Sequence, residues 1–235
     1  MNILKLSHFL IISACILFTS CEKECSDTIS ESFLASNFHT IKAGDDHRIT
    51  LKEASSWSVK ATGCEEDINA LKVYVINGEL SISYPDDYEV NELVKFTIGA
   101  PTFSTLILEE KAACTINGFI DSTEQHTFIL SGTSSCSYTG NASYLDVMLS
   151  GNSDMTVAGI IHRSGIFISG ESTYDARNTS GNIAATIDAN SESTGYVFAL
   201  DTLTAEASGT SRIYYKGDPT VKNFTEIGQG KILPL

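Results

Sequence analysis

The chain has 235 residues, of which 42% are hydrophobic and 19% are charged. This is the composition of a folded globular protein and argues against a disordered one. The formal net charge is −14, with only 15 Lys and Arg residues, which argues against nucleic acid as a partner because phosphate binding needs clustered basic side chains. No segment shows sustained helical periodicity, so we expect an all-β protein.

Residues 1–20 have the features of a lipoprotein signal peptide. Lys5 precedes an unbroken apolar run at 9–18, which is too short to span a bilayer. Thr19-Ser20-Cys21 then resembles a bacterial lipobox, which implies lipidation at Cys21. Cys15, which follows Ile12-Ser13-Ala14, is the alternative, but cleavage there would leave apolar residues on the mature end. We therefore predict a cell-envelope protein, lipid-anchored to the outer membrane through Cys21, with the membrane face left open.

Residues 21–37 are polar and are expected to form a tether between the lipid and a single domain at 38–235. Strand patterns begin at Phe38 and continue to residue 105. Within them, Lys72–Tyr84 alternates in polarity around Asn77-Gly78, which predicts a β-hairpin with a type I′ turn.

A phrase then recurs over 106–235. It begins LSGTSSCSYTG at Leu130 and returns at Leu149, Ile168, Ile187 and Ala207, in steps of 19, 19, 19 and 20 residues. A period near twenty with strand-like content indicates one structural unit stacked repeatedly. We predict a right-handed parallel β-helix-like solenoid with rungs of 19–20 residues, whose first rung is packed against or extended by the strands of 38–105.

Each position of the phrase forms a column with its own role. One inward column contains Cys114, Cys136, Met155, Tyr174, Ser193 and Ile213. Glycines mark the corner, at Gly132, Gly151, Gly170 and Gly209. Serines follow two residues later, at Ser134, Ser153, Ser172, Ser191 and Ser211. A serine repeated in every rung is structural, because a catalytic nucleophile is singular.

Four cysteines remain outside the signal and the lipidation position: Cys25, Cys64, Cys114 and Cys136. Cys114 and Cys136 occupy the same repeat position, where in-register strands hold Cβ atoms about 4.8 Å apart. That separation is wide for a disulfide, so we expect two free buried thiols and leave a Cys114–Cys136 bond open. A Cys25–Cys64 bond is also left open. No Cys or His spacing indicates a metal, and we expect no metal and no cofactor.

Two outward carboxylates offer an enzymatic alternative. Asp154 and Asp175 lie on neighbouring predicted rungs, where they could act as a general acid and base on a carbohydrate. The simpler interpretation is a solvated acidic face rich in Ser and Thr.

Three segments together resemble a known family: residues 94–119 (VKFTIGAPTFSTLILEEKAACTINGF), the SG-x-S rungs, and residues 214–232 (YYKGDPTVKNFTEIGQGKI). They are similar to the putative auto-transporter adhesin, head GIN domain family of Bacteroidetes-type bacteria, over about 38–232. The resemblance implies a β-helical adhesin-like domain, and it supplies no catalytic residues. We therefore expect a non-enzymatic adhesin that binds a glycan or a protein. The alternatives are a carbohydrate-processing enzyme using Asp154 and Asp175, or a purely structural envelope protein.

Overall fold

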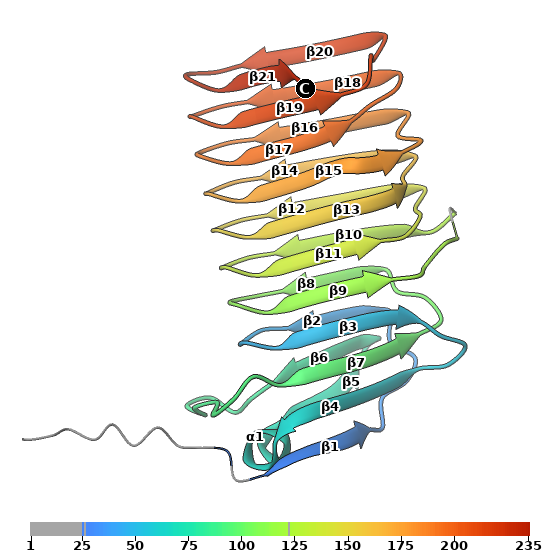
Figure 1. Ribbon diagram of the computed structural model, residues 1–235, viewed down its shortest axis with the longest axis vertical. Coiled ribbons are helices and arrows are strands. Elements are labelled where there is room, and N and C mark those ends of the chain that lie inside the picture. The colour runs from blue at the N-terminus through green and yellow to red at the C-terminus, as the bar shows by residue number, and fades with distance from the viewer. Residues whose placement is uncertain (1–24, 26, 122) are drawn as a thin grey trace, which may run out of the picture.

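A computed structural model describes residues 25, 27–121 and 123–235 (Figure 1). The predicted signal peptide and lipidation position Cys21 lie outside the described residues, as does Cys15. The chain forms a β-solenoid of about seven turns with parallel stacked strands, which confirms the predicted all-β solenoid.

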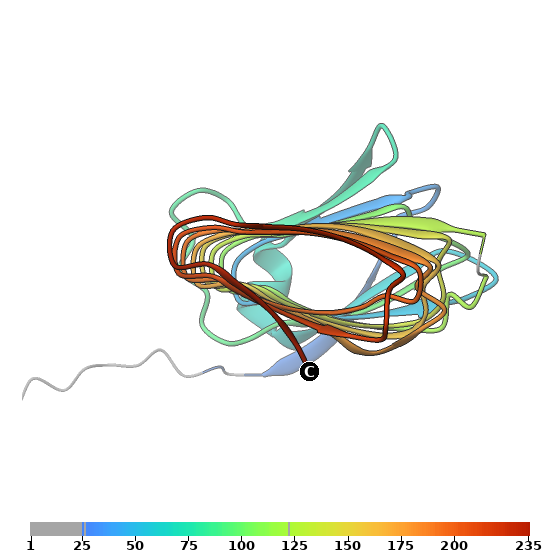
Figure 2. The same ribbon diagram turned by 90° about the horizontal axis from the view of Figure 1, so that it is seen from above.

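Each regular rung contributes one strand to each of two sheets, which face one another along the solenoid (Figures 1 and 2). The first sheet has the order β1-β4-β7-β3-β9-β11-β13-β15-β17-β19-β21, and the second has the order β20-β18-β16-β14-β12-β10-β8-β2-β6-β5. The rungs are β8 (Thr105–Leu108) with β9 (Ala113–Asn117), β10 (Gln125–Leu130) with β11 (Ser135–Thr139), β12 (Tyr144–Leu149) with β13 (Asp154–Ile160), β14 (Arg163–Ile168) with β15 (Thr173–Ser180), β16 (Ala184–Ala189) with β17 (Thr194–Phe198), β18 (Thr202–Ala207) with β19 (Arg212–Lys216), and β20 (Val221–Glu226) with β21 (Lys231–Pro234).

The corners between paired strands follow the expected chemistry. Gly132, Gly151 and Gly170 have φ of +73°, +79° and +73°, in the left-handed region that glycine adopts without steric cost. The buried serines bond back to carbonyls of the preceding rung: Ser134 Oγ donates to the Leu108 oxygen at 3.3 Å, and Ser211 Oγ donates to the Ala189 oxygen at 2.9 Å. The serine column is therefore structural.

The fifth rung departs from the predicted register by two residues. Ile168 pairs with Ala189, not with Ile187, which pairs with Ile166. The cause is a register shift between β13 and β15 after Thr156, followed by a longer corner. Consequently Gly195, not Ser193, lies beside Tyr174 in the inward column. Ser193 instead takes the buried corner position predicted for Ser191.

The strands of 38–105 extend the stack beyond its first rung, which is one of the two arrangements expected for them. β2 (Thr40–Ala43) lies between β6 (Glu79–Ser83) and β8, and β3 (Arg48–Glu53) lies between β7 (Lys95–Ala100) and β9. All of these neighbours are parallel. Along the chain, β2 and β3 come first. The segment that follows builds the N-terminal end of the solenoid, and β6 and β7 then stack on one side of β2 and β3. The strands β8 and β9 stack on their other side.

The N-terminal end is closed by antiparallel strands and a helix, which we name the cap: β1 (Thr28–Phe33), β4 (Ser58–Cys64), α1 (Glu65–Ala70) and β5 (Lys72–Ile76). β1 pairs with β4, and β4 pairs with β7. β1 falls within the segment expected to be a polar tether, and that expectation was wrong for Thr28–Phe33, because Ile29 and Phe33 pack against the core.

The structure shows how the four cysteines pair and whether the predicted hairpin forms. Cys25 and Cys64 form a disulfide with Cα atoms 5.5 Å apart. Cys114 and Cys136 are free, buried and paired in register, as predicted. β5 and β6 form the predicted hairpin, with positive φ at Asn77 and Gly78.

Candidate binding surface

The outer face of the second sheet carries a row of apolar side chains, which we name the apolar stripe: Ile107 and Ile129, which are half-buried, and Met148 and Phe167, which are exposed. These residues are neighbours in register on β8, β10, β12 and β14, so their side chains follow one another at about 4.8 Å. Met148 is 41% exposed and Phe167 is 43% exposed. Tyr144 lies beside the stripe and is 37% exposed. Contiguous exposed apolar surface on a folded protein indicates an interaction site.

Toward the cap, the same column of the sheet continues into a polar groove. Its next members are Lys42, Ser81 and Tyr74, and all three line a groove of about 600 Å³. The remaining lining comes from Gly44, Asp45, Glu79, Ile82, Ser83, Tyr84, Pro85, Asp86, Asp87, Tyr88, Glu109 and Glu110. We name this the acidic groove. Three segments that are distant in sequence build it: residues 42–45, residues 74–88, which contain the β5–β6 hairpin and the loop after β6, and residues 109–110.

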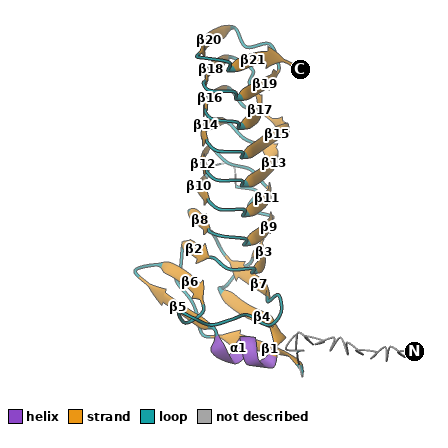
Figure 3. Ribbon diagram, turned by 90° about the vertical axis from the view of Figure 1, so that its left-hand side faces the viewer, coloured by secondary structure: helices purple, strands orange, loops and turns teal. Residues whose placement is uncertain are grey.

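The hairpin gives the groove its wall. Figure 3 shows β5 and β6 leaning away from the stacked second sheet, and the same projection is visible from above in Figure 2. The projecting hairpin and the loop after β6 therefore wall the groove at this end of the second sheet.

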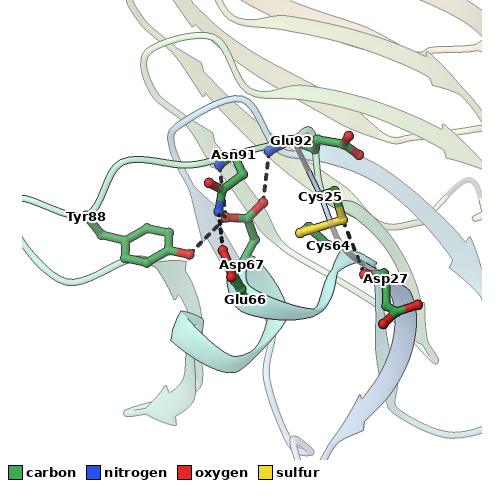
Figure 4. The surroundings of a disulfide bond; sticks show 8 residues. All are labelled: Cys25, Asp27, Cys64, Glu66, Asp67, Tyr88, Asn91 and Glu92. Atoms are coloured by element: carbon green, nitrogen blue, oxygen red, sulfur yellow. Dashed lines mark hydrogen bonds between the residues drawn. A yellow bond between two sulfur atoms is a disulfide. The ribbon is translucent and has the colours of Figure 1, made fainter. Parts of the chain in front are cut away.

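A buried carboxylate holds the loop after β6 in place (Figure 4). Asp67 of α1 is fully buried. Its Oδ1 accepts hydrogen bonds from the Tyr88 hydroxyl at 2.9 Å and from the Asn91 backbone and side-chain nitrogens at 3.0 and 2.8 Å, and its Oδ2 accepts one from the Glu92 backbone nitrogen at 2.9 Å. Tyr88 in turn stacks on Tyr84, with ring centroids 4.9 Å apart. Two lining tyrosines are thus positioned from α1.

The electrostatics of this carboxylate agree with its contacts. Desolvation alone would raise the pKa of Asp67, but the hydrogen bonds from Asn91, Glu92 and Tyr88 outweigh it and lower the pKa below its ordinary value. Asp67 is therefore ionised at neutral pH. The Cys25–Cys64 disulfide lies directly before α1 (Figure 4), so it fixes the helix from which this network starts.

The two carboxylates of the predicted acid–base pair lie on adjacent strands, β13 and β15. Asp154 lies opposite Thr173, and Asp175 lies opposite Thr156, so the two carboxylates are diagonal neighbours on the outer face of the first sheet. Asp175 is paired with Arg177, whose Nε donates to Oδ1 at 2.9 Å. This hydrogen bond and the charge of Arg177 lower the pKa of Asp175. A lowered pKa is the opposite of what a general acid at neutral pH needs.

The first sheet also carries an aromatic pair that sequence analysis missed. Tyr196 and Tyr214 stack with ring centroids 5.1 Å apart, and the Arg177 guanidinium lies 4.4 Å from the Tyr196 ring centroid. The two-residue shift of the fifth rung hid this pair, because the predicted register placed Thr194, not Tyr196, beside Asp175. The acidic groove was missed for another reason: nothing in the sequence joins residues 42–45, 74–88 and 109–110.

Comparison with known proteins identifies the class. The family model of the putative auto-transporter adhesin, head GIN domain, matches residues 37–219. The chain belongs to this family, which confirms the resemblance noted from its sequence. A search of curated proteins gave no match.

Solved structures show the same fold. A putative adhesin from Bacteroides fragilis is 19% identical, with a TM-score of 0.79 over 89% of this chain and 98% of its own. A putative lipid binding protein from Parabacteroides distasonis is 16% identical, with a TM-score of 0.68 over 89% and 97%. A putative adhesin from Parabacteroides merdae is 14% identical, with a TM-score of 0.65 over 89% and 97%. Among the described residues, no helix has the length and apolar character needed to cross a membrane.

Proposed function

We propose that this protein is a non-enzymatic adhesin of the cell envelope, lipid-anchored to the outer membrane at Cys21, which binds a glycan or a protein through the outer face of its second sheet. The observation on which the proposal depends is the apolar stripe. The stripe places four apolar side chains in register on the outer face of a regular sheet, two of them exposed and two half-buried, where they add little to the core and a bound partner would cover them. Family membership points to the same function.

The arrangement of the chain suits presentation from a membrane. Cys21 would lie four residues before Cys25, which the disulfide joins to the cap. The cap would then face the membrane, and the rungs would extend away from it. Eleven strands stacked at about 4.8 Å give a length of roughly 50 Å. A rigid rod of this kind carries a binding face without losing conformational entropy on contact.

The first test asks where the protein is. Protease added to intact cells should cleave the exposed protein, with a periplasmic protein as the internal control. Protection in intact cells together with cleavage after lysis would contradict surface adhesion.

The second test asks whether the stripe binds. The purified protein is applied to arrays of glycans and of extracellular proteins, and the double variant Met148→Ser/Phe167→Ser is compared with Ile183→Ser/Leu200→Ser. The control residues are 48% and 50% exposed and lie outside the stripe, so both variants remove similar apolar area. We expect the stripe variant to lose at least tenfold in affinity and the control to retain wild-type binding. Equal binding by both would refute the proposed face.

The same preparation separates binding from catalysis. The variants Asp154→Asn and Asp175→Asn should bind as the wild type does, because neither carboxylate lies on the second sheet. Turnover of a bound polysaccharide that disappears in both variants would instead establish the enzymatic alternative.

A further inference from the structure

The last rung leaves one end of the solenoid core uncovered. Phe224 of β20 pairs with Ala205, which is 1% exposed, and so continues an inward column of the second sheet. Among the described strands none stacks on the far side of β20, and Phe224 stays 38% exposed. At the opposite end of the molecule, α1 contributes Ile68 to the core, where it is 1% exposed (Figure 1). The end at β20 therefore retains apolar surface that a partner would cover.

The same strand has a free backbone edge. β20 is the terminal strand of the second sheet, and within the described part of the chain it pairs only with β18. In a parallel ladder, every second residue directs its N–H and C=O groups to the same neighbouring strand. Val221 donates its N–H to the Asp201 oxygen at 2.9 Å, so this residue and every second one after it face β18. The intervening residues, Lys222, Phe224 and Glu226, direct their backbone groups away from the sheet.

The side chains of this edge are complementary to themselves. Lys222 and Glu226 lie two residues to either side of Phe224, and all three occupy inward positions. When β20 of a second copy is laid antiparallel with the two Phe224 residues opposite, each Lys222 faces Glu226 of the second copy. Val221, which is 44% exposed, then faces Ile227 of the second copy, which is 50% exposed. Opposite charges and aromatic pairs directly across antiparallel strands are stabilising, whereas like charges are destabilising.

The backbone selects the same register. In an antiparallel pair, two opposite residues exchange both of their N–H···O bonds. The free groups of β20 meet free groups of the second copy when Phe224 faces its counterpart, but a shift by one residue sets them against groups already bonded to β18. A shift by two residues restores the hydrogen bonds and places a charged side chain against Phe224. Only the register centred on Phe224 therefore satisfies both the backbone and the side chains.

The charged side chains of the edge have partners that leave them available. The Lys222 Nζ lies 3.2 Å from Asp218, and the Lys231 Nζ lies 2.9 Å from Glu226. The Lys222 and Glu226 side chains are each 38% exposed, and exposed ion pairs contribute little to stability. A carboxylate also has acceptor sites for more than one donor. Charges on an edge strand exclude an arbitrary apolar strand, but here they accept one that presents the opposite charges in the opposite order.

We propose that two copies of this chain associate end to end, through antiparallel pairing of β20 with β20 of the second copy about a two-fold axis at Phe224. A two-fold interface closes on itself and gives a dimer without longer assemblies. The β21 edge contributes less, because Pro234 has no N–H to donate. This contact is separate from the outer face of the second sheet, to which the proposed function assigns binding.

The dimer has a consequence for adhesion that rests on the proposed function. If the cap of each copy faces a membrane, the two anchors lie at opposite ends of the dimer, and the pair joins two facing membranes. The dimer itself is measured in solution without a membrane. It can therefore hold where surface adhesion fails, and it can fail where the stripe binds its ligand.

The first measurement is sedimentation equilibrium of the purified protein, in about 150 mM salt to screen the repulsion between chains of net charge −14. We expect a monomer–dimer equilibrium with a dissociation constant of about 1–100 µM, as for a small interface. A monomer at every concentration up to about 1 mM would overturn the proposal. Assembly into species larger than a dimer would overturn it as well, because the interface is closed.

Charge reversal tests the register. In Lys222→Glu and in Glu226→Lys, like charges face one another across the two-fold axis, and we expect each variant alone to dimerise at least tenfold more weakly. An equal mixture of the two restores opposite charges at both positions, so it should associate as the wild type does. Lys72→Glu on the exposed face of β5 makes the same change in net charge as Lys222→Glu and should leave dimerisation unchanged. A mixture no stronger than its components would reject the register.

A cross-link tests the pairing without altering the charged residues. Asn223 faces Thr225 of the second copy in this register, and both are exposed. Asn223→Cys mixed with Thr225→Cys should therefore give a disulfide-linked dimer with oxidised glutathione, and each variant alone should give much less. Equal cross-linking by either variant alone would show a different contact and overturn the proposal.

Discussion

The cap and the regular rungs achieve stability by different means. In the rungs from β10 to β19, each residue contacts its counterpart one rung away, and columns of Gly, Ser and apolar side chains repeat the same contacts. In the cap, no contact repeats: a disulfide, one buried carboxylate and antiparallel pairing each act once. A repeated contact distributes stability along the solenoid, whereas a single contact concentrates it. Substitutions that remove one of the cap's contacts should therefore destabilise the cap strongly and leave the rungs unaffected.

Loss of the disulfide should have the largest effect and should be confined to the cap. It closes a loop with a sequence separation of 39, for which loop entropy gives about 4 kcal/mol. In Cys25→Ala/Cys64→Ala we expect amides of β1, β4 and α1 to lose hydrogen-exchange protection, while those of β12 to β17 keep it.

The control for this prediction is Cys114→Ala/Cys136→Ala, which removes two thiols that are not bonded to each other. It should leave exchange in the cap unchanged. Uniform loss of protection over the whole chain in the disulfide variant would show that the cap and the rungs form one cooperative unit, and not two regions of separate stability.

This difference also explains what the sequence could predict. The rungs were predictable because their residues recur every 19 positions, as Cys136, Met155 and Tyr174 do. The fifth rung was misplaced because apolar residues at both 187 and 189, and serines at both 191 and 193, fit either register. The β13–β15 irregularity and the longer corner that follows it decide between them. The sequence indicated neither β1 nor the acidic groove, because each depends on contacts between segments that are distant in sequence and that occur only once.

In the rungs, the largest effect should come from a corner glycine. Gly170 has a φ of +73°, and a Cβ added there would collide with the Gly151 carbonyl oxygen of the preceding rung. We expect Gly170→Ala to cost about 3 kcal/mol, of which about 1–2 kcal/mol is the left-handed backbone. Gly44→Ala is the control, since no atom lies closer than 3.9 Å to its added Cβ, and its urea midpoint should match the wild type. Equal destabilisation by both would contradict the stacked-corner account.

The single-contact character of the cap can be tested at Asp67. Asp67→Asn replaces one acceptor oxygen by a donor that faces other donors, at a cost of about 2 kcal/mol. Because the fold lowers the pKa of Asp67 below its ordinary value of 3.8, its contribution is complete above that value and is lost as pH falls through the folded pKa. The stability gap between wild type and variant should therefore shrink below about pH 4. Asp218→Asn, whose side chain is 99% exposed, should show no gap at any pH.

The smallest expected change in stability distinguishes Ser191 from Ser193, either of which fits the serine column of the repeat. Ser191 occupies the corner position of Gly170 with a φ of +63°, so Ser191→Gly should stabilise the protein by about 0.5–1 kcal/mol through relief of the left-handed backbone. Ser193 is fully buried, and its hydroxyl donates to the Asn190 oxygen at 2.7 Å, so Ser193→Gly should cost about 2 kcal/mol. The register predicted from the sequence requires the reverse order, with Ser191 buried and costly to replace. Thermal midpoints of the two variants thus decide the register of the fifth rung, and with it whether Tyr196 lies beside Asp175 on the outer face of the first sheet.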